Sequence, residues 1–267
     1  MRIGELEILP VVDGAVSVPA AAAYAHDGTT GKGTNAADWE PHEQFLDADG
    51  KLEIVMGGFL IRSGARVMLV DAGLGPANAM GLPGGRFLDS LAGHGVQPGD
   101  VTDMVFTHLH FDHVGWASDA GEAVFPNATY RCDVRDWQHF VGTDEQATQK
   151  LTPIEPRLEL FDGDTTLAPG VDARLASGHT PGSTIIVLSS GEDRALLIGD
   201  IVHCPVELVD DEWSGMADVD PALAQRTRNA LARELEGSDV PVAAAHFPGL
   251  EFGRVLAGTG RRQWVFG

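Results

Sequence analysis

The sequence has few cysteines, and none is arranged to pair with another. Cys132 and Cys204 are the only two in 267 residues, and they lie far apart in the chain. Neither belongs to a CxxC pair. A disulfide framework and a zinc knuckle made of thiolates are therefore both excluded.

Basic residues are also scarce. The chain has 18 Lys and Arg against 39 Asp and Glu, which gives a formal net charge of -21 at pH 7. Such an excess of negative charge repels the phosphates of nucleic acids and anionic lipid surfaces. We therefore expect neither a nucleic acid nor a membrane as a partner.

Long apolar runs are missing as well. No run approaches the roughly 18 apolar residues of a membrane helix. Residues 1–10 do not combine a basic segment with an apolar one, as a secretory signal would. The hydrophobic share of 43% is enough to bury a substantial core. Since neither a signal nor a membrane helix is found, we expect a cytoplasmic protein. Because no repeat or linker interrupts the chain, we expect a single domain over residues 1–267.

Short apolar segments rich in Val, Ile and Leu, bounded by Gly or Asp, predict a fold with many strands. The predicted strands are 5–12, 53–62, 66–71, 103–107, 171–176, 183–189, 194–199 and 241–245. Helices are predicted over 87–92, 133–140 and 220–236, the last with Asp220 as N-cap and Pro221 in the first turn. Residues 14–49 are rich in Ala, Gly and Asp, and we interpret them as a long excursion near one face, a candidate lid.

The sequence lacks a complete motif for nucleotide binding and for a serine nucleophile. Residues 73–78 begin like GxGxxG but end in Asn, and Pro76 interrupts the turn. Residues 31–33 lack the Ser or Thr that follows Lys in a phosphate-binding loop. No GxSxG elbow occurs, which excludes serine hydrolases of that type.

One short segment concentrates side chains that bind metals. Residues 107–113, Thr-His-Leu-His-Phe-Asp-His, directly follow the apolar run 104–106. A loop that leaves a strand can turn such side chains inward together. Imidazole nitrogen and carboxylate oxygen suit Zn²⁺, and also Fe or Mn. Because a short loop rarely wraps four adjacent ligands around one ion, we expect two metals to share His108, His110, Asp112 and His113.

The segment 108–113 matches the HxHxDH signature of the metallo-β-lactamase superfamily, and other segments agree with that resemblance in order. Residues 178–182, Gly-His-Thr-Pro-Gly, resemble the turn with the third histidine. Residues 197–200 resemble the strand that delivers a bridging aspartate, and residues 245–247 resemble the last histidine. Residues 69–73 resemble the early strand with its structural aspartate. The resemblance covers about residues 50–250 and implies an α/β protein, an αβ/βα four-layer sandwich.

The resemblance also implies a dinuclear site whose ligands are histidines and aspartates at strand ends. These are His108, His110 and His179 for one metal, Asp112, His113 and His246 for the other, and Asp200 between the two. We expect two divalent ions, zinc by default, with Fe, Mn and Co as alternatives. Asp71 is expected to hydrogen-bond the ligand loop and fix its orientation.

A water molecule shared by two cations loses its proton near neutral pH and becomes a hydroxide nucleophile. Asp112 is the candidate to hold or accept that proton. The superfamily's acyl-homoserine lactonases carry a tyrosine three residues after the bridging aspartate, and here that position is His203. His203 is a candidate catalytic residue that donates a hydrogen bond to the developing oxyanion or protonates the leaving group. A neutral structural histidine is the alternative.

Cys204 is poorly placed to supply the thiolate of true zinc β-lactamases, so the chain resembles the lactonase, glyoxalase II and phosphotriesterase branches instead. We predict hydrolysis of an ester or lactone, such as an acyl-homoserine lactone. The alternatives are a phosphotriester or arylester hydrolase on the same metals, and an iron-dependent oxidoreductase similar to a sulfur dioxygenase.

Aromatic residues near the predicted ligand loops are candidates to line an apolar pocket, and packing in the core is the alternative for each. Together they suggest a small, uncharged and partly hydrophobic substrate. They are Phe111, Trp116, Trp137, Phe140, Trp213 and Phe247. A homodimer is compatible with the sequence.

Overall fold

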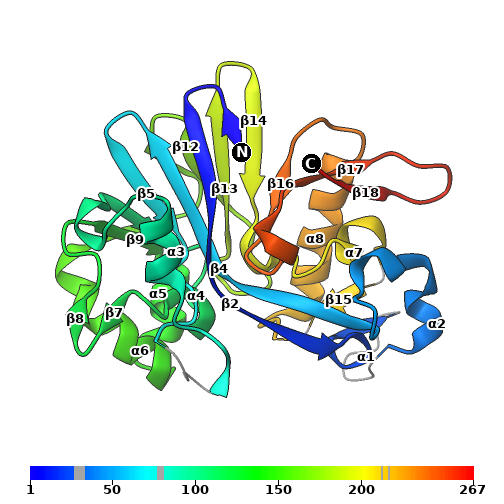
Figure 1. Cartoon of the computed structure of the whole chain (residues 1–267), viewed down its shortest axis with the longest axis horizontal. Helices are drawn as coiled ribbons and strands as arrows, with labels where there is room; N and C mark the ends of the chain where they lie inside the picture. Colours follow the sequence, from blue (N-terminus) through cyan, green and yellow to red (C-terminus); the bar gives the residue numbers. More distant parts are fainter. Residues whose placement is uncertain (27–33, 77–80, 212, 216) are drawn as a thin grey trace.

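Two large β-sheets pack face to face at the centre of the molecule (Figure 1). The computed structural model describes residues 1–26, 34–76, 81–211, 213–215 and 217–267. In spatial order, the first sheet contains β1 (Arg2–Ile3), β2 (Leu6–Pro19), β4 (Lys51–Ser63), β5 (Arg66–Val70), β6 (Asp103–Val105), β9 (Thr129–Asp133) and β10 (Leu158–Phe161). The second contains β11 (Thr165–Ala168), β12 (Val171–Leu175), β13 (Thr184–Ser190), β14 (Asp193–Leu197), β16 (Val242–Ala243), β17 (Gly253–Leu256) and β18 (Gln263–Phe266).

Helices cover the outer face of each sheet, which gives four layers (Figure 1). The helices on the first sheet are α3 (Phe87–Gly93), α5 (Val134–Phe140) and α6 (Glu145–Leu151). Those on the second are α7 (Val206–Val209) and α8 (Pro221–Leu235). This arrangement confirms the predicted α/β class and the αβ/βα sandwich.

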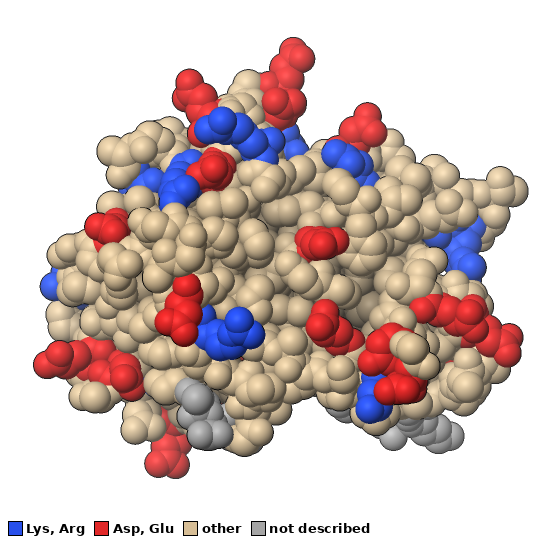
Figure 2. Space-filling view, in the orientation of Figure 1, with Lys and Arg blue, Asp and Glu red and all other residues tan. Residues whose placement is uncertain are grey.

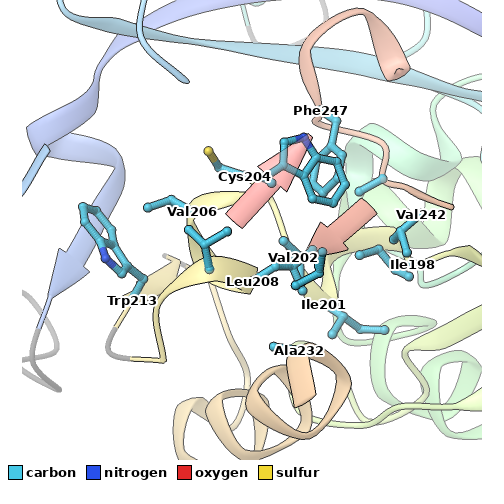
Figure 3. Packing of buried hydrophobic residues seen from close by; sticks show 14 of the residues in the cluster. Ile198, Ile201, Val202, Cys204, Val206, Leu208, Trp213, Ala232, Val242 and Phe247 are labelled. Atoms are coloured by element: carbon cyan, nitrogen blue, oxygen red, sulfur yellow. The ribbon is translucent and has the colours of Figure 1, made fainter. Parts of the chain in front are cut away.

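Three apolar layers hold the four structural layers together. Phe59 and Ile186 pack between the two sheets, and Met104 and Phe87 pack between the first sheet and its helices. The third layer lies between the second sheet and α8 and includes Ile198, Val202, Leu208, Ala232 and Phe247 (Figure 3). Full burial of one large aliphatic or aromatic side chain is worth about 1.5–3 kcal/mol. These layers therefore fix how the strand ends of the two sheets face each other.

A β-bulge at Asp13 bends β2. The pairing with β4 shifts register between Val12 and Gly14, which leaves Asp13 as the extra residue. The Asp13 carboxylate is fully buried. It accepts hydrogen bonds of 2.7–3.2 Å from the backbone N–H groups of Leu74, Gly75, Gly85 and Phe87, and from Nε1 of Trp116. One carboxylate thereby ties β2 to the loop after β5 and to the start of α3.

Beyond the bulge, β2 continues further than the sequence predicted. Residues 14–19, which we assigned to the excursion, are strand residues paired with 51–56 of β4. The alternation there was too short to recognise, but the long partner strand stabilises it. The chain then forms α1 (Ala20–Ala23), β3 (Tyr24–His26) and α2 (Ala36–Trp39), and β3 pairs with β15 (Trp213–Gly215). Residues 27–33 of the predicted excursion, with the rejected 31–33 motif, lie outside the described residues, as do residues 77 and 78 of the rejected 73–78 motif.

The three predicted helices are present as α3, α5 and α8 within one residue at each end. Asp133 and Asp220 cap α5 and α8, because their side chains accept hydrogen bonds from Arg135 N and Leu223 N. Among the strands of four or more residues and the helices of seven or more that the structure describes, sequence analysis missed β9, β10, β11, β17, β18 and α6. Among the described residues, no helix combines the length and apolarity that a membrane crossing requires.

Candidate metal centre

The predicted site residues come from four segments that each follow a strand. The segment after β6 leads through His108 and His110 into α4 (Phe111–Val114). The other three segments follow β12, β14 and β16 and carry His179, Asp200 and His246. β14 and β16 run parallel, as do β5 and β6, so their carboxyl ends meet at one edge of the sandwich. The structure brings all seven predicted ligands together at this edge.

His108, His110 and His179 form the first group. Nδ1 of His110 lies 3.0 Å from Nε2 of His108 and 3.0 Å from Nε2 of His179. Three imidazoles therefore present nitrogen atoms to one small space.

The second group consists of Asp112, His113 and His246, and Asp200 lies between the two groups. Nε2 of His246 is 3.5 Å from Oδ2 of Asp112 and 3.0 Å from Oδ2 of Asp200. Nε2 of His113 is 3.2 Å from Oδ1 of Asp200. Oδ2 of Asp200 is also 3.7 Å from Nε2 of both His108 and His179. This is the position that a bridging carboxylate requires.

Two atoms inside this cluster test whether it fits metal ions. Nε2 of His113 and Oδ1 of Asp200 are buried and have no hydrogen-bond partner among the described residues. An unsatisfied buried polar atom typically costs about 1–3 kcal/mol. Lone pairs that converge without protons between them suit cations. The histidine and aspartate clusters therefore fit two divalent metals.

Hydrogen bonds on the side of the histidines that faces away from the cluster also indicate a metal site. Nδ1 of His113 donates to Asp71 Oδ2 at 2.9 Å, Nδ1 of His179 donates to Asp218 Oδ1 at 3.0 Å, and Nδ1 of His246 donates to the Val55 carbonyl oxygen at 2.7 Å. With its proton on Nδ1, each imidazole turns the lone pair of Nε2 toward the cluster. Metal-bound histidines are usually oriented in this way.

Asp71 has the predicted place beside the ligand loop. It adopts a left-handed backbone conformation with φ of 62° at the end of β5. Its Oδ1 accepts from the Thr107 backbone N–H, and its Oδ2 accepts from the Thr107 hydroxyl, both at 2.8 Å. The Thr107 hydroxyl oxygen in turn lies 3.1 Å from Nδ1 of His108 and accepts its proton. Asp71 thus orients His113 directly and His108 through Thr107.

Asp136 is a residue that sequence analysis missed. It lies on α5 and accepts hydrogen bonds from Leu109 N at 3.2 Å, the Thr180 hydroxyl at 2.8 Å and Gly182 N at 2.6 Å. It joins the loop of His108 and His110 to the loop of His179. Burial raises the pKa of Asp136 to about 6, against the opposing effect of these hydrogen bonds. Its partners are 27 to 46 positions away, so no local pattern marks Asp136 in the sequence.

The electrostatics of the cluster favour cation binding. Burial, followed by the neighbouring charge of His179, lowers the pKa of His110 to about 4 and leaves its lone pair available. Burial acts to raise the pKa of Asp200, but His113 and His246 outweigh it and hold that pKa well below the ordinary value. The Asp200 carboxylate in turn outweighs burial and raises the pKa of His113 and of His246. Without a metal, protons on these two histidines balance the buried carboxylate, and a bound cation would take their place.

His203 lies in the same cluster. Its Nε2 is 3.4 Å from Oδ2 of Asp200, and its ring stacks on that of His246 with centroids 5.6 Å apart. Burial acts to lower the pKa of His203, but the carboxylates of Asp200 and Glu207 outweigh it and raise the pKa to about 10. His179, Asp200 and His203 also place ligand atoms within 4.8 Å of one another. His203 is thus close enough to the metal centre to act on a bound substrate.

A cavity of about 430 Å³ opens onto these residues. Its apolar walls come from Val16, Ala23, Tyr24, Ile54, Met56, Leu82 and Phe111, and its polar end from His110, Asp112, His179, Asp200, His203 and His246. Of the six aromatic residues proposed from the sequence, only Phe111 lines this cavity. The other five pack in the apolar layers, as the core alternative for these residues has it: Trp116, Trp137, Phe140, Trp213 and Phe247.

The order and spacing of the ligand loops are those of a known family. A family model described as the metallo-beta-lactamase superfamily matches residues 58–246. The chain belongs to the metallo-β-lactamase superfamily. This confirms the family predicted from the HxHxDH segment.

Relatives within this superfamily are distant in sequence and close in fold. N-acyl homoserine lactonase AiiA of Bacillus thuringiensis subsp. kurstaki is 24% identical over 157 residues, which cover 59% of this chain and 60% of the relative. The human metallo-beta-lactamase domain-containing protein 1 is 29% identical over 197 residues, which cover 69% of this chain and 63% of the relative. The chain therefore spans less than two thirds of the curated relatives it matches.

Two solved structures superpose on nearly the whole chain. AidC, a dizinc quorum-quenching lactonase in complex with a product, gives a TM-score of 0.84 at 24% identity, covering 99% of this chain and 95% of that one. The hydrolase AbOPH of the beta lactamase superfamily gives a TM-score of 0.85 at 25% identity, with the same coverage. The predicted hydrolase of this superfamily agrees with these neighbours.

Proposed function

We propose that this protein is a dinuclear metal hydrolase that opens the ring of a lactone, with acyl-homoserine lactones as the first candidates. The observation that carries the proposal is the position of the seven-residue cluster at the inner end of an apolar cavity. Lactonases among the relatives and the solved structures support it.

Zinc is the metal we propose, with Fe, Mn and Co as alternatives. The donor set of five histidines and two aspartates suits zinc, and AidC, with the same fold, is a dizinc enzyme. When bound, the metals would polarise the substrate carbonyl and lower the pKa of a water molecule.

The side chains around the metals have distinct roles in this proposal. The Asp112 carboxylate, which lines the cavity, accepts and holds the proton of the attacking water. His203, which also lines the cavity, donates a hydrogen bond from Nε2 to the substrate oxygen on which negative charge develops. Partial burial of both groups strengthens these interactions, because solvent screens them less than at the surface.

The cavity walls select the substrate. None of the residues that the structure places in the lining is Lys or Arg, so positive charge is confined to the metal end and none lies along the apolar walls. Acidic side chains are scattered over the face shown in Figure 2, among fewer basic ones. An uncharged substrate with an apolar tail along Val16, Ile54 and Met56 satisfies both conditions. Ala23 and Tyr24, from the described part of the segment predicted as an excursion, wall the same cavity, which supports our proposal that residues 14–26 help to enclose the substrate.

A comparison of substrate classes tests the proposal. The purified protein, loaded with Zn²⁺, is offered acyl-homoserine lactones of several chain lengths, aryl esters and phosphotriesters, and product formation is followed by chromatography. We expect lactone opening to have the highest kcat/KM and the metal-free protein to be inactive. Faster turnover of phosphotriesters or aryl esters would contradict the lactone assignment. Oxygen uptake by an iron-loaded sample, with no hydrolysis, would contradict the hydrolase assignment altogether.

A further inference from the structure

A fully buried arginine lies directly behind the metal centre. Arg228 is on α8, and its side chain has no exposed surface. Its Nε donates a hydrogen bond to the carbonyl oxygen of Ile201 at 2.8 Å. Ile201 is the residue that follows Asp200, so Arg228 braces the backbone that delivers the bridging carboxylate.

Two buried carboxylates share this guanidinium. Nε of Arg228 lies 3.0 Å from Oε1 of Glu207, and Nη2 lies 3.4 Å from Oδ2 of Asp218. Both carboxylates are at most 1% exposed. Burial acts to lower the pKa of Arg228, but Glu207 and Asp218 raise it, so the guanidinium remains charged. The three groups form a carboxylate–guanidinium–carboxylate chain.

Each carboxylate uses its second oxygen to hold a different part of the site. Oδ1 of Asp218 accepts the Nδ1 proton of His179 at 3.0 Å. Oε2 of Glu207 accepts hydrogen bonds from the backbone N–H of His203 at 2.7 Å and of Cys204 at 3.1 Å. The chain of contacts therefore runs from His179 to His203 through three buried ionic groups.

Stability alone does not account for such an arrangement. Taking ions out of water is costly, and well-packed apolar side chains are often as stabilising as a buried ion group. A guanidinium does what an apolar side chain cannot: it attracts two carboxylates at once while its Nε–H group is held by the Ile201 carbonyl oxygen. What these contacts determine is the direction in which two imidazoles of the site point.

We propose that Arg228 is a positioning residue that sets the relative orientation of His179 and His203 through Asp218 and Glu207. The inference rests on the proposed dinuclear site. Arg228 keeps Asp218 in place to hold the proton on Nδ1 of His179, which leaves Nε2 free for the metal. It keeps Glu207 in place to hold the His203 backbone, which directs the His203 ring at the substrate. Without Arg228, two buried carboxylates would repel each other and lose these positions.

The first experiment compares Arg228→Met with Arg233→Met, a control on the same helix whose side chain is 58% exposed. Metal release to a chelator is timed, and kcat and KM are measured on the substrate that the wild type turns over best. Loss of an outer hydrogen bond on a metal ligand typically costs about 10–100-fold in metal affinity or activity. We expect Arg228→Met to release metal about 10-fold faster and to lower kcat about 10-fold, with KM within about 2-fold. Arg233→Met should match the wild type.

A second variant separates positioning from simple charge balance, because Arg228→Met alone could fail to fold. The double variant Arg228→Met with Glu207→Gln has the same net charge in this buried group as the wild type. If Arg228 positions the histidines, the double variant regains thermal stability in the metal-free state but still releases metal quickly and keeps a low kcat. If it regains wild-type metal retention and kcat, Arg228 is only a counter-charge and the inference is overturned.

Metal release needs no substrate, so this readout tests the inference even if lactones prove to be the wrong substrate class. A wild-type protein that holds no metal would overturn the dinuclear site and this inference together.

Discussion

Replacing Asp71 by asparagine should weaken one metal position much more than the other. Asparagine keeps the shape of the side chain and tolerates the left-handed backbone conformation of this residue, where φ is 62°. Its amide oxygen can still accept from the Thr107 backbone N–H in place of Oδ1. Its NH₂ group replaces Oδ2, which accepts from the Thr107 hydroxyl and from Nδ1 of His113. Two hydrogen bonds to a charged acceptor are lost.

The consequence for His113 follows from its tautomer. An NH₂ group facing Nδ1 favours the imidazole with its proton on Nε2. Nε2 of His113 lies 3.2 Å from Oδ1 of Asp200. It also faces the proposed metal position that His113 shares with Asp112 and His246. A proton there blocks a metal ligand. Changes of this kind cost about 10–100-fold in metal affinity, or about 1.4–2.7 kcal/mol.

Metal titration into the metal-free protein, monitored by competition with a chelating dye, measures this directly. We expect the site of His113 to weaken about 10–100-fold, and the site of His108, which Asp71 reaches only through Thr107, to weaken less. Asp103→Asn is the matched control, since Asp103 is equally buried but binds Arg66 and Arg131 at the other end of β6. The control should lose stability and keep both metal affinities. Two wild-type affinities in Asp71→Asn would refute the tautomer argument.

Three further predictions concern the bridge, the substrate contact and the bulge. Asp200→Ala should loosen both metals, because its carboxylate faces both groups of ligands; full metal content by elemental analysis would show that it is not a bridge. His203→Ala should lower kcat by roughly 10-fold with KM and metal content nearly unchanged; normal turnover would make His203 structural, and loss of a metal would make it a ligand. Asp13→Ala removes the acceptor of five hydrogen bonds and should lower the free energy of unfolding by about 4 kcal/mol or more. Denaturant melts would measure this, and a loss below about 1 kcal/mol would mean that water replaces the carboxylate.

The convergence of the site residues could be predicted because most of the information is local. His108, His110, Asp112 and His113 lie in one short segment, and His179, Asp200 and His246 each follow a recognisable strand. Two sheets that pack in the usual way must bring such strand ends to one edge. Asp71 could be placed beside the ligand loop from the family resemblance, but the other residues that orient the ligands could not be predicted, since nothing in their own neighbourhoods marks them.

Those orienting contacts are separated widely along the chain. Val55, whose carbonyl oxygen contacts His246, is 191 positions away from it in the sequence, and Asp218 is 39 positions away from His179. A backbone carbonyl has no signature in a sequence at all. The missed strands have a related cause: β10, β11 and β18 lie at sheet edges, where apolar residues are needed on one face at most. The burial of five of the six aromatic residues was decided by packing in the outer layers.

The stretch of β4 from Ile54 to Met56 has two tasks in one backbone segment. The side chains of Ile54 and Met56 form part of the cavity wall, while the carbonyl of Val55 between them holds His246. Substitutions at positions 54 and 56 reshape the space for the substrate tail and leave the Val55 carbonyl in place. An insertion or deletion in this strand would move the carbonyl and disturb a metal ligand as well. Natural variation and directed evolution of chain-length preference should therefore proceed here by point substitution, and changes in length should accumulate outside this stretch.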